Sequence, residues 1–128
     1  MEPYKKKIIL IEDDYAMGDL LQTLLQIEGY QTCLLKIDQD ANRLVEAVCQ
    51  EEPELILMDV HLRQTSGLEL IGLFKKEPCL DSTHYILSSG INYQAESVKA
   101  GADAFILKPY MPDELVEQIK SILGDTNG

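Results

Sequence analysis

Three short apolar runs in this sequence each end at ionisable residues that could do phosphoryl chemistry. The first run is followed by Glu12, Asp13 and Asp14, the second by Asp59, and the third by Lys108. If the runs are parallel strands, these charges gather at one edge of one sheet, because such strands end at a common edge where ligands bind. Carboxylates bind a divalent cation, and a lysine attracts phosphoryl oxygens. The spacing therefore predicts a site that combines a cation with a phosphoryl group.

Asp59 is the one acid that stands alone at the end of a central strand, so we predict that it is the nucleophile. A carboxylate can attack phosphorus only if its repulsion from the phosphoryl oxygens is neutralised, and a metal ion with a lysine does this. Mg²⁺ keeps several waters and needs two or three protein carboxylates. Glu12, Asp13 and Asp59 can supply them, and Asp14 is then expected to cap the following helix.

Each of these residues also has a plainer interpretation. Acids near a helix start are often partners of the helix dipole, and an aspartate after a strand is commonly a turn former. A lysine before proline is usually a surface residue. We favour the functional interpretation of Asp59, because a turn leaves Lys108 and the acidic pair of Glu12 and Asp13 unexplained.

The elements that must position these residues follow from short apolar runs that alternate with segments of helical periodicity. Strands are expected at residues 7–12, 31–35, 54–58, 85–87 and 104–107, and helices at 15–28, 40–50, after Gly67, at 93–99 and at 112–123. Five such alternations imply an α/β fold, a doubly wound five-stranded parallel sheet with right-handed crossovers and helices on both faces.

Length and composition indicate one globular domain over residues 1–128, with a core at 7–123 and flexible ends at 1–6 and 124–128. The net charge of −11 argues against nucleic acid as a direct partner, because a polyphosphate backbone repels an acidic surface. The apolar run after the basic start is too short for a signal peptide or a membrane span.

Three cysteines, Cys33, Cys49 and Cys79, make an odd number with no CxxC pair and no metal-ligand spacing. We therefore expect reduced thiols in a cytoplasmic protein.

Taken in order, these marks resemble the receiver domain of two-component response regulators over residues 7–123. They comprise the acids after the first strand, Asp59, and then Gly67, Ser88, Ala100, Gly101, Ala102, Asp103, Lys108, Pro109 and Tyr110. The resemblance implies a flavodoxin-like fold with strand order 2-1-3-4-5 and Mg²⁺ as cofactor. It also implies that a sensor histidine kinase or a histidine phosphotransfer protein phosphorylates one aspartate.

The resemblance further assigns roles to single residues. The backbone carbonyl of His61 is implied as a metal ligand, and Lys108 as the contact of the phosphoryl oxygens, before a cis bond to Pro109. Ser88 is implied to donate its hydroxyl to the phosphoryl group, and Phe105 to be the aromatic switch. Phosphorylation then reshapes the face of the fourth helix, fifth strand and fifth helix, which binds partners and could pair two copies of the chain.

Plainer interpretations remain for these residues as well. On composition alone, Phe105 is simply a core residue, Ser88 an ordinary loop serine, and the side chain of His61 a solvent-facing loop histidine. The sequence also departs from the family. Arg63 stands where the family often has proline, so we expect a more mobile loop, and the segment between Ser88 and Lys108 is shorter than usual.

The sequence thus predicts a phosphoacceptor switch that performs its own phosphorylation and dephosphorylation and turns over no external substrate. Three rivals stay open. An FMN-binding electron carrier of the same fold is disfavoured because acids after the first strand would repel the FMN phosphate. A phosphatase with an aspartyl nucleophile would require a second acid two residues after Asp59, and this chain has His61 there. The third rival is a receiver-like scaffold that is not phosphorylated. We expect no output domain within residues 1–128, which suits either a stand-alone regulator or a fragment of a larger regulator or hybrid kinase.

Overall fold

The computed structural model of the chain describes residues 4–37 and 40–125. All the expected strands and helices are present, and their boundaries differ from the expected ones by one or two residues at most. In chain order the elements are β1 (Lys7–Ile11), α1 (Tyr15–Ile27), β2 (Gln31–Leu35), α2 (Ala41–Glu51), β3 (Leu55–Asp59), α3 (Gly67–Phe74), the short 3₁₀ helix η1 (Pro78–Leu80), β4 (His84–Ser89), α4 (Gln94–Ala100), β5 (Ala104–Leu107) and α5 (Pro112–Leu123).

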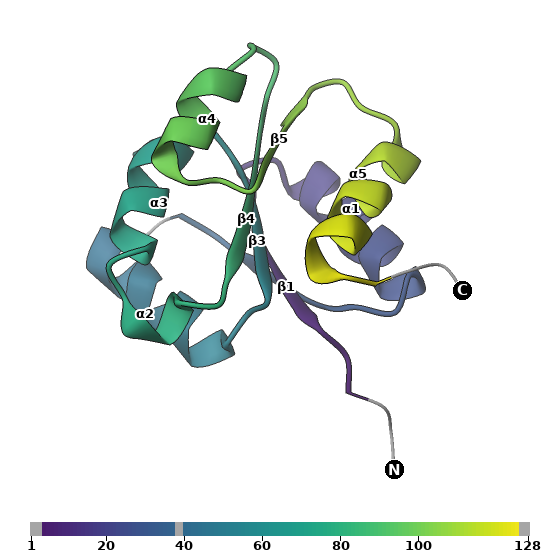
Figure 1. Cartoon of the computed structure of the whole chain (residues 1–128), viewed down its shortest axis with the longest axis horizontal. Helices are drawn as coiled ribbons and strands as arrows, with labels where there is room; N and C mark the ends of the chain where they lie inside the picture. Colours follow the sequence, from purple (N-terminus) through teal and green to yellow (C-terminus); the bar gives the residue numbers. More distant parts are fainter. Residues whose placement is uncertain (1–3, 38–39, 126–128) are drawn as a thin grey trace.

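The strands form one parallel sheet in the order β2-β1-β3-β4-β5, as the sequence and the family resemblance predict. Figure 1 shows the sheet edge-on, with α2, α3 and α4 on one face and α1 and α5 on the other. Because all strands run the same way, their carboxyl ends meet at one edge. That edge carries Glu12, Asp59 and Lys108.

Both faces of the sheet are buried, which explains why its strands are continuous apolar runs. All five residues of β3 are buried, and their side chains alternate between the two cores. Ile56 packs in the core under α2 and α3 with Phe74, whereas Leu57 packs in the core under α1 and α5 with Ile119. Asp59 is thus fixed at the end of the best-packed strand.

Local signals in the sequence set where the helices begin and end. Asp14 caps α1, since its Oδ1 accepts a hydrogen bond from the N–H of Met17 at 3.2 Å, which confirms the predicted capping role. Gly29 follows the end of α1 at a φ of 98°, a conformation that glycine adopts without steric cost. Leu44 and Val48, which lie four residues apart on one face of α2, are buried.

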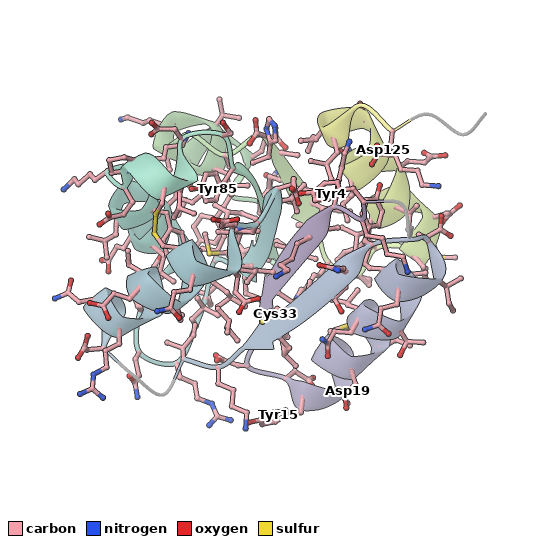
Figure 2. All side chains as sticks on the ribbon, turned by 90° about the horizontal axis from the view of Figure 1, so that it is seen from below. Tyr4, Tyr15, Asp19, Cys33, Tyr85 and Asp125 are labelled. Atoms are coloured by element: carbon pink, nitrogen blue, oxygen red, sulfur yellow. A yellow bond between two sulfur atoms is a disulfide. The ribbon has the colours of Figure 1, made fainter. Side chains whose placement is uncertain are left out.

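The prediction of three reduced thiols is wrong for two of the cysteines, because the structure joins Cys49 and Cys79 in a disulfide. Figure 2 shows this bond, together with Cys33 on β2, which is the free cysteine. The sequence pattern failed because the two residues are far apart in the chain. The last turn of α2 and the turn before β4 bring them together, with their Cα atoms 5.8 Å apart.

Parts of the two predicted flexible ends contact each other. The ammonium of Lys6 lies 2.7 Å from Oδ1 of Asp125, and the hydroxyl of Tyr30 donates to Oδ2 of Asp125 at 2.8 Å. The rest of the predicted flexible ends, residues 1–3 and 126–128, lies outside the described residues. Over residues 4–37 and 40–125, no helix has both the length and the apolar character needed to cross a bilayer.

Candidate functional site

Asp59 ends β3, and the parallel register with β4 places Ser88 directly opposite it. Both residues are buried, and Asp59 is 8% exposed. The hydroxyl of Ser88 donates a hydrogen bond to Oδ1 of Asp59 at 2.9 Å. A buried carboxylate needs such partners, because an unpaired charge in a protein interior is costly. The sheet register alone therefore pairs two of the predicted site residues.

Lys108 follows β5 and carries the positive charge of the site. Its backbone N–H donates to the carbonyl of Ser89 at 2.8 Å, and the bond that follows it, to Pro109, is cis. Its ammonium lies 2.7 Å from Oδ1 of Asp59 and 3.7 Å from Oε2 of Glu12. Burial alone would lower the pKa of Lys108, but the hydrogen bond and charge of Asp59, with those of Glu12, raise it above the ordinary value. Lys108 therefore stays protonated.

Glu12 follows β1, and its side chain is 8% exposed. Burial, followed by hydrogen bonding to Asp59 and the charge of that residue, raises the pKa of Glu12 to about 7. Burial is the largest cause of this rise and the nearby carboxylate of Asp59 adds to it, whereas the charge of Lys108 opposes it. The carboxylate oxygens of Glu12 and Asp59 are of the type that Mg²⁺ prefers as ligands.

Asp13 lies at the same edge but turns toward the loop after β3. Its Oδ2 accepts a hydrogen bond from the backbone N–H of Arg63 at 2.8 Å. No three carboxylates of the described residues place ligand oxygens within 4.8 Å of one another, so Asp13 does not form a ready triplet with Glu12 and Asp59. Glu12 and Asp13 do line one cavity of about 160 Å³, but Lys36 and Arg63 line it as well, and Asp59 is not among its lining residues.

The bond between Arg63 and Asp13 was not foreseen from the sequence. A proline at position 63, as in much of the family, could not make it, because proline has no backbone N–H. Arg63 therefore adds a contact between this loop and an acidic residue of the site. The greater loop mobility expected from the missing proline stays a prediction.

A comparison with known protein families settles which fold family this geometry represents. Residues 8–120 match the profile of the response regulator receiver domain. The chain belongs to this family.

Full-length relatives and solved structures agree with this assignment. The receiver domain is 24% identical to the DNA-binding response regulator MtrA of Mycobacterium tuberculosis over 96% of this chain and 53% of the relative. It is 30% identical to the transcriptional regulatory protein GltR of Pseudomonas aeruginosa over 92% of this chain and 49% of the relative. The chain spans about half the length of these relatives.

A solved structure supports both the family and the fold. The receiver domain superposes with a TM-score of 0.82 on the response regulator receiver domain protein (CheY-like) from Methanospirillum hungatei. The two chains are 30% identical, and the match covers 95% of this chain and 96% of the other. Nothing in the fold or the relatives favours an FMN-binding electron carrier.

The receiver domain places the remaining predicted site residues around this centre. The side chain of His61 is exposed, as expected, and its ring meets that of Tyr93 edge-on at 5.3 Å between centroids. Phe105 is half-buried on β5 and packs partly against the core under α2 and α3. The structure thus brings Asp59, Ser88, Lys108 and Glu12 into contact, whereas His61 and Phe105 lie on neighbouring elements.

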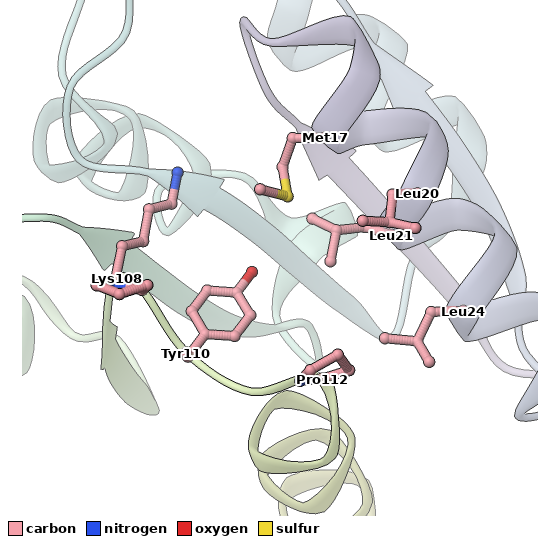
Figure 3. A pocket seen from close by; sticks show the side chains of 8 residues that line it. Met17, Leu20, Leu21, Leu24, Lys108, Tyr110 and Pro112 are labelled. Carbon is pink, nitrogen blue, oxygen red and sulfur yellow. The ribbon is translucent and has the colours of Figure 1, made fainter.

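An apolar groove beside Lys108 was not predicted from the sequence. Figure 3 shows side chains of α1 facing Tyr110 and Pro112 across it. The groove has a volume of about 350 Å³, and Leu20 on its α1 wall is 63% exposed. Burial, followed by the charges of Asp59 and Glu12, raises the pKa of Tyr110 to about 12, so its hydroxyl stays protonated. Met17 and Leu20 are exposed apolar side chains of α1 that line the groove, and only the fold shows that they lie beside the site.

Proposed function

We propose that Asp59 is the phosphoacceptor of this receiver domain and that its phosphoryl donor is the phosphohistidine of a sensor histidine kinase or a histidine phosphotransfer protein. In this transfer a bond forms between a carboxylate oxygen of Asp59 and phosphorus, and the bond between phosphorus and the histidine nitrogen breaks. The observation that carries the proposal is that the buried carboxylate of Asp59 contacts both the ammonium of Lys108 and the hydroxyl of Ser88.

Lys108 and Ser88 are proposed to contact the transferred group once Asp59 is modified. Both donors already point at Oδ1 of Asp59, at 2.7 and 2.9 Å, so small side-chain movements suffice to bring them to phosphoryl oxygens. The ammonium neutralises charge that develops on these oxygens. The hydroxyl belongs to Ser88 on β4, so its movement toward the phosphoryl group couples the modification of Asp59 to that strand. Because both donors contact Asp59, we propose this aspartate as the one at the sheet edge that is phosphorylated.

The proposal includes Mg²⁺ as the cofactor, with Glu12, Asp13, Asp59 and the backbone carbonyl of His61 as its protein ligands. The positions of Glu12 and Asp59 around one ammonium, that of Lys108, and of Asp13 at the same edge of the sheet support this assignment. When bound, Mg²⁺ supplies the positive charge that allows a carboxylate to approach a phosphoryl group. The carboxylate of Asp13 must turn toward the others to join them.

The proposed output is a change in the face formed by α4, β5 and α5, with Phe105 as its aromatic switch. β5 is an edge strand, and this part of the molecule exposes apolar side chains, with Val98 59% and Leu107 48% exposed. Such a face suits a protein partner or a second copy of the chain. We propose no direct contact with nucleic acid, because the net charge is −11.

The groove between α1 and Tyr110 is proposed as the docking surface of the phosphodonor. A donor must deliver its phosphohistidine to Asp59, and Lys108 lines both the site and this groove. An apolar helix face of the donor would cover the exposed Leu20. The domain itself turns over no external substrate in this proposal, and it acts in the cytoplasm with the kinase that phosphorylates it.

Acetyl phosphate tests the proposal without the native donor. We expect the chain to gain one phosphoryl group in the presence of Mg²⁺ and none with EDTA, as measured by intact mass. Asp81→Asn removes an exposed acid far from the site and should be labelled like the unchanged chain. Equal labelling with and without Mg²⁺ would refute the metal-dependent site.

A further inference from the structure

A second cluster of metal-ligating side chains lies at the opposite edge of the sheet from Asp59. Cys49 is on the last turn of α2, which leads into β3, and Glu77 and Cys79 belong to the turn before β4. One ligand atom from each of the three residues lies within 4.8 Å of the other two. Among the described residues this is the one group of three such side chains that meets this distance.

The fold fixes the positions of these three residues. Cys49 packs partly against the core under α2 and α3, so one side of the cluster is anchored. Glu77 precedes η1, and Pro78 occupies the first position of that helix. The side chain of Glu77 makes no capping hydrogen bond, and the ion pairs between described residues do not include it. The carboxylate is therefore placed beside the sulfur atoms without a local partner.

We propose that, in the reduced protein, Cys49, Cys79 and Glu77 bind a thiophilic divalent cation of the zinc class, and that the Cys49–Cys79 disulfide is the oxidised, metal-free form of the same site. Thiolates select zinc over magnesium, and a carboxylate oxygen is a common additional ligand. This site is separate from the Mg²⁺ site at Asp59, which offers oxygen ligands alone.

Distances allow both forms without movement of the backbone. The Cα atoms of Cys49 and Cys79 are 5.8 Å apart, within the range of about 4.4–6.8 Å for disulfides. Two thiolates on a tetrahedral zinc, each about 2.3 Å from the metal, lie about 3.8 Å apart, which side-chain rotation alone can reach. An adjacent cavity of about 630 Å³, lined by Glu46, Cys49 and Glu77 among others, leaves room for water or Glu46 as the fourth ligand.

The two forms interconvert by a balanced thiol–disulfide exchange. A dithiol gives two electrons and two protons to the disulfide and becomes a disulfide itself, which leaves Cys49 and Cys79 as thiols. Metal binding then releases the two thiol protons to solvent, because thiolates are the ligands. A reducing cytoplasm favours the thiol form, in which the metal can bind.

Cobalt absorption spectroscopy tests this site on the full chain. The protein is reduced with a water-soluble phosphine, its Asp59 site is saturated with Mg²⁺, and Co²⁺ is added as the probe. We expect one Co²⁺ per chain with a thiolate-to-cobalt charge-transfer band in the near ultraviolet, and we expect Zn²⁺ to displace it. The oxidised chain should show no such band.

Variants assign the band to residues. Cys49→Ser and Cys79→Ser should each abolish it, and Glu77→Gln should weaken Co²⁺ binding by about tenfold. Cys33→Ser is the matched control, since it removes the free cysteine on β2 and should leave the band unchanged. Circular dichroism confirms that each variant is folded. A reduced chain without the band, a band that survives either serine variant, or Glu77→Gln binding as tightly as the unchanged chain would overturn the proposal.

Protection from oxidation gives a second, independent test. Glutathione disulfide is the oxidant, and the remaining free thiols are counted over time. The reduced chain should form the Cys49–Cys79 disulfide several-fold more slowly with Zn²⁺ bound than without it, because the metal occupies the attacking thiolates. Equal rates would contradict binding by these sulfur atoms.

Discussion

Gly67 lies against the backbone of Asp59 so closely that a methyl group on its Cα would overlap the Asp59 carbonyl oxygen. The same methyl group would come within 2.9 Å of a side-chain carbon of Leu87 on β4. The N–H of Gly67 also donates to the carbonyl of Val60 at 2.8 Å. The start of α3 is thus packed directly onto the residue that we propose to be phosphorylated.

Gly67→Ala should therefore destabilise the protein and displace Asp59. We expect a loss of about 1–3 kcal/mol of unfolding free energy, because the added methyl group meets backbone that cannot move aside. Urea denaturation measures the loss, and the rate of labelling by acetyl phosphate should fall as well.

Gly72→Ala is the matched control on the same helix. A Cβ at position 72 meets nothing within 4 Å, and alanine is a better helix former than glycine. This variant should gain about 0.5–1 kcal/mol. If Gly67→Ala proved as stable as Gly72→Ala, the close approach to Asp59 would not constrain the site.

Lys108→Ala separates cation binding from the response to phosphorylation. The ammonium lies between Glu12 and Asp59, so its removal takes away a competing positive charge and should retain or tighten Mg²⁺ binding. The conformational response to beryllofluoride, followed by backbone amide NMR shifts, should weaken. Lys76→Ala, after the end of α3, removes an exposed lysine outside this face and should change neither property. A full response in Lys108→Ala would remove this lysine from the proposed switch.

The hydrogen bond between Arg63 and Asp13 predicts how Mg²⁺ affinity depends on position 63. Arg63→Pro removes the donor and frees Asp13 to turn toward Glu12 and Asp59, so Mg²⁺ should bind more tightly. A bond of this kind contributes about 0.5–1.5 kcal/mol, equivalent to about a two- to tenfold change in affinity. Arg63→Ala removes the same guanidinium but keeps the N–H. Calorimetric titration should give a lower Mg²⁺ dissociation constant for Arg63→Pro than for Arg63→Ala. A higher dissociation constant for Arg63→Pro would show that the hydrogen bond to Asp13 assists metal binding.

Asp125 gives a pH-dependent contribution to stability away from the site. Its hydrogen bond to Lys6, followed by that from Tyr30, lowers the pKa of the carboxyl below its ordinary value of 3.8. Because the folded pKa is the lower one, the contribution is complete above pH 3.8 and disappears as the pH falls through the folded pKa.

Asp125→Asn should therefore cost stability at neutral pH, by less than about 1 kcal/mol for such an exposed pair, and cost less at pH 3, which lies below the ordinary pKa of 3.8. Thermal unfolding at both pH values measures the difference. Asp19→Asn changes an exposed aspartate on α1 and should behave the same at both. An effect of Asp125→Asn that grew on acidification would contradict the assigned direction.

Much of the fold was predictable because local pattern and tertiary packing agree. The apolar runs are buried on both faces of a parallel sheet. Asp14 caps the beginning of α1 and Gly29 follows its end, both through local backbone chemistry. The meeting of Asp59 with Lys108 followed from one property of the fold, that all carboxyl ends of the strands share an edge. The fold and the meeting of Asp59 with Lys108 could both be predicted from the order of strands and helices along the chain.

Other features depend on packing between distant segments, which sequence spacing does not report. Cys49 and Cys79 meet because α2 ends beside the turn before β4, so counting cysteines predicted thiols where the structure has a disulfide. The turn of Asp13 toward Arg63 depends on the path of one loop. The predicted switch role of Phe105 concerns a change between two states, and it stays a prediction.

Locating the phosphoryl group tests the central claim most directly. After treatment with acetyl phosphate and Mg²⁺, tandem mass spectrometry of proteolytic fragments should place the group on Asp59, and Asp59→Asn should carry none. Modification of Asp13, Asp14 or any other residue in the unchanged chain, or undiminished labelling of Asp59→Asn, would contradict the account.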